Sequence, residues 1–196
     1  MRSSPSSHRG GIAKELYVSD AERLIAKITP ETPAEQVRYD LALELLDDVR
    51  RLDAQTKESH RRIRIAVKAS GTSLTDLYGV GPIIAAQIIG YAGDVGRFAN
   101  RDAFASYNGT APIEWSSGGR VVHRLSRRGN RRLNHALHMA AITQIRNPGT
   151  DGRIYFERKV AEGKTKKEAL RSLKRQISNA VYRQLLLDVE RGPGGR

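Results

Sequence analysis

Residues 34–69 read AEQVRYDLALELLDDVRRLDAQTKESHRRIRIAVKA, and this stretch decides the fold class. Its apolar or small residues recur three or four positions apart, which is the spacing of one face of an α-helix. These positions are Val37, Leu41, Leu45, Val49, Leu52, Thr56, Ser59, Ile63 and Ala66. A helix of this length with charges on its other faces indicates a helical arm or coiled coil. An ordinary amphipathic helix packed on its own domain is the alternative, and the pattern allows a break near Thr56 and Ser59.

The segments before this helix are short. Residues 1–11 are polar and predict a disordered lead-in, and residues 12–28 are weakly helical. The prolines of residues 29–33 indicate a linker. We therefore expect a lead-in over 1–33, a long helical arm over 34–70, a helical domain over 71–190 and a flexible tail over 191–196.

The chain beyond the arm also has mainly helical patterns. Short helices are predicted around residues 74–77, 82–89, 102–107, 130–146 and 152–162, and residues 109–128 are read as a loop or a β-ribbon. The last helix begins with Thr165 as N-cap and Glu168 three residues later, which is a capping-box pattern. Its apolar stripe consists of Leu170, Leu173, Ile177, Val181 and Leu185. The predicted fold class is therefore mainly α.

The composition excludes several classes of protein. No stretch approaches the roughly 20 apolar residues of a membrane span, and the amino terminus lacks the apolar segment of a signal peptide. The 196 residues include no cysteine, so disulfides and thiolate metal sites are excluded. We expect a cytoplasmic, nucleoid-associated protein without a membrane partner.

The charge is concentrated in the C-terminal part. Residues 1–117 hold 15 basic and 15 acidic side chains, whereas residues 118–196 hold 19 basic and 6 acidic ones and account for the net charge of +13. Such asymmetry points to a polyanionic partner, most often a nucleic acid. A basic surface that only maintains solubility is the alternative.

Two glycines around residue 80 suggest a nucleic-acid contact. The sequence from Leu77 to Pro82 has the form of a helix-hairpin-helix turn, in which Gly79 and Gly81 let a phosphate approach the N–H groups of the next helix. Such a contact fixes position and reads no sequence. A plain helix–helix corner that needs glycine for positive φ is the alternative.

A second candidate site combines serines with arginines. Ser116 and Ser117 precede two glycines, and residues 118–132 contain six arginines and no carboxylate. Arginines can neutralise the negative charge that builds on a phosphodiester attacked by a serine hydroxyl. On local charge we assign this role to Arg120, Arg124, Arg127 and Arg128, and nucleic-acid binding also to Arg131 and Arg132. A glycine-flexed basic loop that only grips the nucleic-acid backbone is the alternative.

An ordered series of motifs between Leu74 and Leu187 resembles a known family. The motifs are Gly79-Val80-Gly81-Pro82, Phe98, residues 104–112, Ser116-Ser117-Gly118-Gly119, residues 126–133 and residues 136–141. Together they resemble the C-terminal transposase domain of the serine-plus-DEDD insertion-sequence transposases, the "IS one-ten" family. These enzymes are similar to Piv-type DNA invertases, and some members are guided by a bridge RNA.

The resemblance implies a mechanism and several partners. The serine directly before the glycine, Ser117, corresponds to the family's nucleophile, with Ser116 as the fallback. The partner is then DNA, with a guide RNA as a further candidate, and the arm corresponds to the family's coiled-coil segment, which suggests a homo-oligomer. We expect a truncated transposase in which Mg²⁺ enters only with an acidic DEDD partner domain, so that this chain holds no cofactor. A non-catalytic nucleic-acid-binding remnant, or a regulator of full-length transposase, is the alternative.

Other residues receive structural interpretations. Asp40, Asp47 and Asp48 have ion-pair partners at helical spacing, such as Asp47 with Arg51. His135 and His138 lie three apart but lack a third metal ligand, and Trp115 is read as a core anchor or a base-stacking residue. We expect the basic residues of the last helix to lie opposite its apolar stripe, as a backbone-tracking or a solvated face. They are Lys166, Lys167, Arg171, Lys174 and Arg175.

Overall fold

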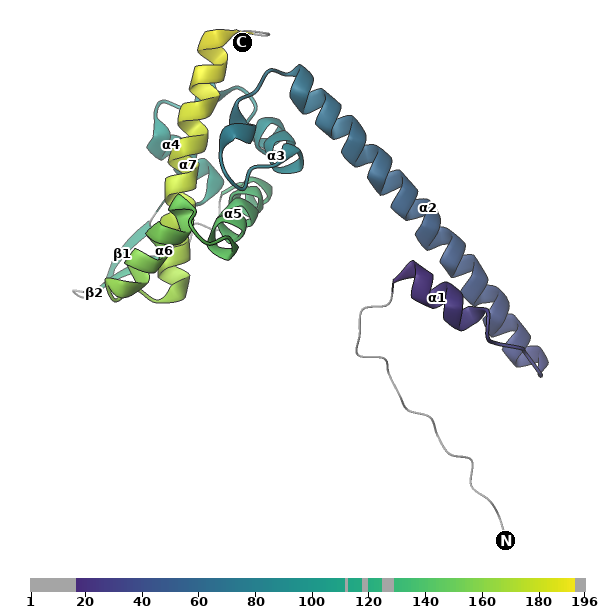
Figure 1. The fold of residues 1–196 in the computed structure, drawn as a ribbon. Helices are drawn as coiled ribbons and strands as arrows, with labels where there is room; N and C mark the ends of the chain where they lie inside the picture. The colour runs from purple at the N-terminus through teal and green to yellow at the C-terminus, as the bar shows by residue number, and fades with distance from the viewer. Residues whose placement is uncertain (1–16, 112, 118–119, 125–128, 193–196) are drawn as a thin grey trace. The chain divides into compact units, whose positions relative to one another are not determined.

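The computed structural model describes residues 17–111, 113–117, 120–124 and 129–192. The predicted lead-in over residues 1–11 lies outside this range, as do the last four residues. The described chain is mainly helical, which confirms the predicted fold class (Figure 1). It divides into two compact units, residues 1–59 and 60–196.

The predicted arm is one continuous helix, α2, over Pro33–Ala69. The weak point of the stripe at Thr56 and Ser59 does not end it. Thr32 and Glu35 cap its first turn, because Thr32 Oγ1 accepts from the Glu35 N–H at 3.2 Å and Glu35 Oε2 accepts from the Thr32 N–H at 3.2 Å. These reciprocal bonds satisfy N–H groups that a helix start leaves without partners.

A short helix, α1 over Val18–Ile25, lies against the first half of α2. Ala42, Leu46 and Val49 of α2 line the apolar depression under α1, and Arg50 binds Glu22 at 2.6 Å. This contact divides the predicted stripe of α2, because its members Leu45 and Val49 also line the depression. Its residues Val37, Leu41 and Leu52 are 67%, 52% and 55% exposed.

Two of the three predicted acidic residues form ion pairs on the surface of α2, while Asp40 accepts a hydrogen bond from Gln36 at 2.8 Å. Asp47 binds Arg50 at 2.9 Å and Asp48 binds Arg51 at 2.7 Å. Each pair spans three residues, so Arg51 is the partner of Asp48 and not of Asp47.

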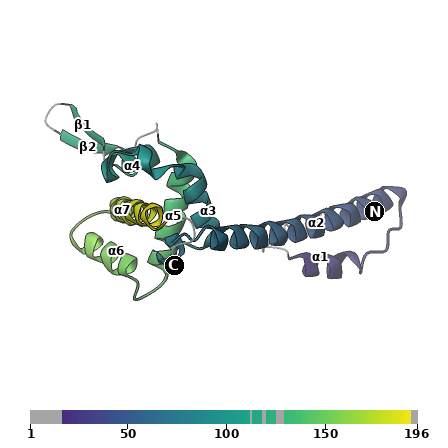
Figure 2. The same cartoon turned by 90° about the horizontal axis from the view of Figure 1, so that it is seen from above.

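The second unit is a helical domain around two long helices, α5 (Arg131–Arg146) and α7 (Lys166–Arg191). α3 (Pro82–Ala92) packs on α5, α4 (Arg101–Asn108) packs on α7, and α6 (Asp151–Ala161) packs on both. Two single turns, η1 (Leu74–Asp76) and η2 (Val95–Arg97), link these helices. Residues 113–124 contain a two-stranded antiparallel ribbon, β1 (Ile113–Ser117) and β2 (Arg120–Arg124), which extends beyond α4 in Figure 2.

The core of this domain lies among α3, α4, α5 and α7. Phe104, Leu133, Leu137 and Val181 are fully buried, and each such side chain contributes roughly 1.5–3 kcal/mol of transfer free energy. The rings of Phe98 and Phe104 meet edge to face with centroids 5.2 Å apart. The stripe predicted for the last helix is confirmed, since its members are buried or half-buried and pack in this core.

Four helices of the helical domain, α4, α5, α6 and α7, begin with side-chain caps. Asn100, Asn130 and Thr150 accept hydrogen bonds from the first-turn N–H groups of α4, α5 and α6. The predicted capping box between Thr165 and Glu168 is present at the start of α7. The helix starts are therefore determined by local sequence.

The last turns of α2 belong to the helical domain. Val67 is buried in its core, and Ile63 packs against it. The Asp188 carboxylate of α7 accepts hydrogen bonds from the hydroxyls of Thr72 and Ser73 and from the Ser73 N–H. These bonds fix the segment between α2 and η1 to the end of α7.

Candidate nucleic-acid interface

The ribbon places the two serines at its far end. Ser117 is the last residue of β1 and pairs with Arg120, Ser116 pairs with Val121, and Ile113 pairs with Arg124. At about 3.4 Å per residue, Ser117 lies about 14 Å along the strand from Ile113. Of the predicted arginines, Arg120 is therefore the nearest to Ser117 in register, while Arg124 is at the other end of the ribbon.

Two glycines close the root of the ribbon, where the chain leaves α4 and enters α5. A Cβ on Gly129 would lie 2.8 Å from the Gly109 nitrogen and 2.9 Å from its Cα. Gly109 has a φ of 70°, and the Asn130 N–H donates to the Tyr107 carbonyl at 2.7 Å. Only residues without side chains permit this backbone approach. Arg127 and Arg128, between the ribbon and the root, lie outside the described residues.

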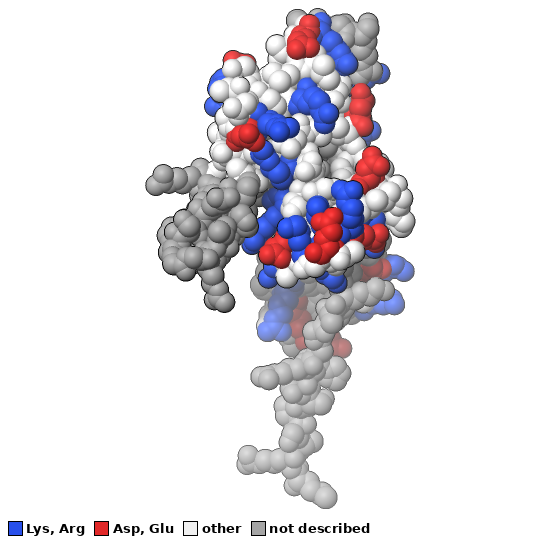
Figure 3. Space-filling model, turned by 90° about the vertical axis from the view of Figure 1, so that its left-hand side faces the viewer, with Lys and Arg blue, Asp and Glu red and all other residues white. Residues whose placement is uncertain are grey.

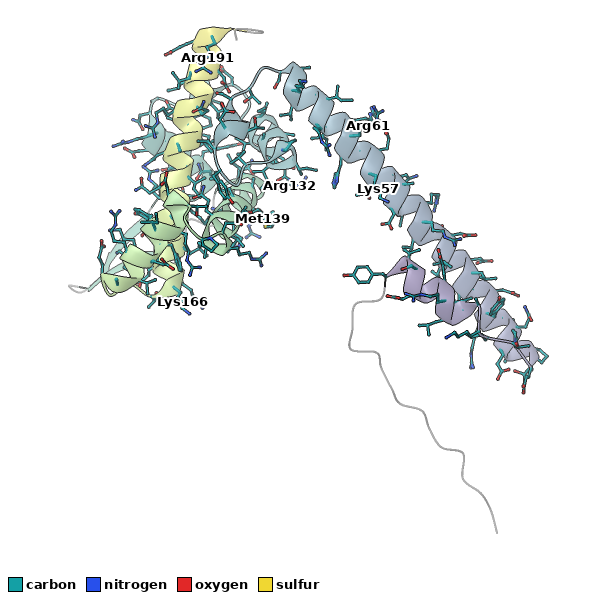
Figure 4. The ribbon with its side chains drawn as sticks, in the orientation of Figure 1. Lys57, Arg61, Arg132, Met139, Lys166 and Arg191 are labelled. Atoms are coloured by element: carbon teal, nitrogen blue, oxygen red, sulfur yellow. The ribbon has the colours of Figure 1, made fainter. Side chains whose placement is uncertain are left out.

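Arg131 and Arg132 are exposed on the first turn of α5, next to this root. Asn130 caps that turn by accepting from the Arg132 and Leu133 N–H groups. The Arg132 guanidinium donates to the Tyr91 hydroxyl at 3.1 Å and lies 5.8 Å from its ring centroid. The bond to Tyr91 raises the pKa of Arg132. Figure 4 labels Arg132 at this position.

Sequence reasoning missed Arg97. Its guanidinium carbon lies 4.5 Å from the ring centroids of both Phe98 and Tyr107. Stacking on aromatic faces restricts the guanidinium while its edge stays available for a phosphate. The hydrogen bonds from Asn130 and then from Arg97 lower the pKa of Tyr107. The available signal was the basic residue directly before Phe98.

In the turn at residues 79–81, the backbone geometry requires glycine at position 79 but not at position 81. Gly79 has a φ of 84°, and a Cβ there would lie 2.7 Å from the Ala140 carbonyl oxygen of α5. Gly81 precedes Pro82 at the start of α3 with a φ of −75° and open space around it. η1 is a single 3₁₀ turn, so the helix-hairpin-helix assignment stays a prediction, as does phosphate binding at Gly81.

A buried polar network lies between α4, α5 and α7. Asn108 Nδ2 donates to Ser178 Oγ at 2.8 Å, and Asn134 Nδ2 donates to the Asn108 carbonyl at 2.7 Å. Lys174 Nζ in turn donates to Asn134 Oδ1 at 2.6 Å. Burial of Lys174 lowers its pKa to about 8, because a low-dielectric site disfavours the charged form.

The predicted basic face of α7 therefore needs correction. Lys166, Lys167 and Arg171 are exposed, but Lys174 is buried. Arg175 pairs with Asp102 of α4. Lys174 and Arg175 thus lie against α5 and α4, because α7 is packed on both. On the face drawn in Figure 3, lysine and arginine side chains form a run down the middle of the helical domain.

Neither a metal cluster nor a membrane helix is found in the described part of the chain. No three His, Asp or Glu side chains there are grouped so that they could hold a metal ion, so these residues do not fit the Mg²⁺ of a DEDD domain. None of the described helices is long and apolar enough to cross a membrane. His135 and His138 lie on α5, and the pKa of His138 is lowered by burial and by the charges of Lys174 and His135.

This helical domain, with a projecting ribbon and exposed arginines at its root, is suited to a polyanionic partner. Residues 71–155, which include the turn, the ribbon and the root, match the family model described as Transposase IS116/IS110/IS902 family. The match supports the family resemblance seen in the sequence.

Several known insertion-element proteins are similar to this chain in sequence. The chain is 29% identical over 179 residues to the "Insertion element IS116 uncharacterized 44.8 kDa protein" of Streptomyces clavuligerus, covering 86% of this chain and 44% of that protein. It is 35% identical over 113 residues to the "Insertion element IS110 uncharacterized 43.6 kDa protein" of Streptomyces coelicolor, covering 57% and 28%. It is 29% identical over 121 residues to the "Probable family 20 transposase" of Pseudomonas aeruginosa, covering 60% and 36%. The chain spans less than half the length of these relatives.

The two glycines of the turn give a matched test. Gly79→Ala should lower the free energy of unfolding by about 2 kcal/mol, because it combines a positive φ with a backbone clash. Gly81→Ala should stay within about 0.5 kcal/mol of the parent protein, because its backbone suits any residue. Urea denaturation measures both. Equal losses at the two positions would contradict this account of the turn.

Proposed function

We propose that the chain is a DNA-binding transposase module that acts in DNA transposition, with Ser117 as the nucleophile. The observation that carries the proposal is the position of Ser117 at the end of a ribbon whose root bears exposed arginines, all within the segment that matches the transposase family model. The names of the relatives support the same activity. Because the chain spans less than half of those proteins, the activity of the whole enzyme enters here as a proposal.

The chemistry follows from the groups at the ribbon. Ser117 Oγ attacks the phosphorus of a DNA phosphodiester, the bond to the leaving DNA oxygen breaks, and that oxygen takes a proton. The serine is then joined to DNA through a phosphodiester, which conserves the bond for rejoining. Arg120, paired with Ser117, is the first candidate to neutralise charge on the phosphoryl oxygens.

The root supplies binding that reads no sequence. Arg132 is held by Tyr91 and Arg97 by Phe98 and Tyr107, so both guanidiniums are partly ordered before a ligand arrives. Ordering before binding reduces the entropy cost of each phosphate contact. Arg97 and Arg131 therefore join Arg132 as candidate backbone contacts, and a guide RNA would present the same phosphates.

A second function, a binding module without catalysis of its own, is favoured by one observation. The described residues contain no group of acidic or histidine side chains that could hold Mg²⁺. A serine hydroxyl is a weak nucleophile without a base or a metal to promote loss of its proton. If the chain alone is a binding module, Ser117 acts as a nucleophile only together with an acidic partner domain.

A covalent adduct distinguishes the two functions. The chain alone should bind DNA and form little or no adduct that survives denaturation, with or without Mg²⁺. Addition of an intact acidic DEDD domain should restore the adduct, and Ser117→Ala should abolish it with DNA affinity nearly unchanged. Denaturing gels with labelled DNA measure both. An adduct made by the chain alone would refute the need for a partner domain, and loss only in Ser116→Ala would identify the other serine.

The exposed stripe of α2 supports self-association through the arm. Val37, Leu41 and Leu52 do not line the depression under α1 and are more than half exposed. Apolar residues at this helical spacing are buried between helices in coiled coils. We therefore propose that α2 pairs with a second copy of the chain.

Sedimentation tests this pairing. The parent chain should be a dimer at tens of micromolar, and Leu41→Glu with Leu52→Glu should give a monomer, because the pairing would bury two charges. Leu43→Glu with Ala54→Glu is the matched control, since each position lies about 200° around the helix from its counterpart. This control should remain a dimer. A monomeric parent chain would refute the proposal.

A further inference from the structure

Lys174 is a buried cation without a described counter-ion. The residue is 9% exposed, and its Nζ donates to Asn134 Oδ1. An ammonium has three N–H donors, and within the described ranges this is the single acceptor that contacts it. No carboxylate contributes to its electrostatic environment there. A buried charge is costly unless it is paired, so the arrangement calls for an anion from elsewhere.

Three other basic residues of the helical domain have carboxylate partners. Lys159 binds Glu162 at 2.6 Å, and Arg153 binds Glu157 at 2.5 Å. Arg175, one position after Lys174, pairs with Asp102. These three side chains are less buried than Lys174. The more exposed cations of this set thus have carboxylate partners, whereas the most buried one, Lys174, has a neutral amide as its described partner.

The groups around Lys174 add positive potential. Arg171, one turn earlier on α7, lowers the pKa of Lys174 together with burial. His138 lies one turn after Asn134 on α5, and burial and then the charge of Lys174 lower its pKa. Asn134 and His138 are half-buried, Arg171 is exposed, and Lys174 keeps 9% exposure. The Lys174 side chain therefore has neighbours that reach the surface.

The site is connected to the ribbon by two hydrogen bonds. Lys174 Nζ donates to Asn134 Oδ1, and Asn134 Nδ2 donates to the carbonyl of Asn108. Asn108 is the last residue of α4 and directly precedes Gly109 at the ribbon root. The Lys174 site is thus linked through Asn134 and Asn108 to the root of the ribbon.

We propose that Lys174 and His138 bind one backbone phosphate of the nucleic acid engaged by the ribbon. The ammonium supplies the charge and the two donors that no described acceptor takes, and a ring N–H of His138 supplies a further donor. Asn134 holds the ammonium in place while the site is empty. This inference rests on the proposed nucleic-acid binding. Because DNA and RNA share the phosphodiester, the test compares the two.

The first arm of the test measures affinity. The full chain and Lys174→Met are titrated with a DNA duplex and an RNA duplex of about 20 base pairs over a range of salt concentrations. Lys174→Met should bind roughly fivefold more weakly at about 100 mM salt, with the salt slope lowered by about 1, as for one lost phosphate contact. Lys159→Met removes a lysine that already has a carboxylate and should leave affinity and slope unchanged. Loss on one nucleic acid alone identifies that one as the source of the phosphate.

The second arm uses inorganic pyrophosphate and needs no nucleic acid. About 10 mM pyrophosphate should raise the Tm of the parent chain by about 2–4 °C, as mass action requires for a ligand of the folded state. The shift should vanish in Lys174→Met and in Lys174→Gln. Both variants should fold, because each removes a buried charge and keeps most of the side-chain volume. The second variant maintains a readout if the first one fails to fold.

The outcomes separate the two proposals. If the parent chain binds neither nucleic acid, the proposed function fails, and the pyrophosphate shift still decides whether Lys174 is an anion site. Equal pyrophosphate shifts in the parent chain and both variants would overturn the site. Equal affinity and salt slope in the parent chain and Lys174→Met would overturn its assignment to a nucleic-acid phosphate.

Discussion

The close approach of two backbones at Gly109 and Gly129 is the constraint on which the rest of the candidate site depends. It brings the end of α4 to the start of α5, so that the chain between them must leave the domain as a projecting ribbon. A side chain on Gly129 would separate the two segments by clashing with the backbone of Gly109. The hydrogen bond from Asn130 to Tyr107 and the network through Asn108 depend on the same approach. The position of Ser117 at the far end of the ribbon therefore depends on the absence of side chains at Gly109 and Gly129.

The ribbon root also lies next to two guanidiniums that aromatic rings hold in place. Arg97 and Arg132 lie on aromatic rings that also brace the root, so packing energy holds guanidiniums that no described carboxylate neutralises. Lys174 follows the same logic in the interior, where an amide replaces a counter-ion. Cations without described partners lower the free energy of unfolding of the domain, and binding of a polyanion to the folded state raises it again. Arg132 and Lys174 are thus two of the side chains behind the positive charge of the C-terminal part.

Much of the fold was predictable because helices are encoded locally. The 3.6-residue periodicity predicted α2 and α7, and Thr165 with Glu168 marked the start of α7 through its capping box. What failed depended on tertiary contacts. Lys174 was expected on an exposed face, since a one-dimensional pattern cannot show that α4, α5 and α6 all pack against α7. Arg97 was missed because its rings come from two different elements, and the partner of Asp47 changed because three- and four-residue spacings are both open on a helix.

The central claim is that the arginine-rich segment around the ribbon root binds the nucleic-acid backbone, and the salt dependence of affinity tests it most directly. For a few phosphate contacts, affinity of the parent chain for duplex DNA should fall roughly ten- to a thousandfold between about 50 and 200 mM salt. Replacement of Arg127, Arg128, Arg131 and Arg132 by Gln together should flatten that slope, because each phosphate contact contributes about 0.9 to it. Replacement of Arg158 and Lys159 on α6 is the control for a general loss of charge and should leave the slope nearly unchanged. An unchanged slope in the fourfold variant would place the binding surface elsewhere and contradict the account.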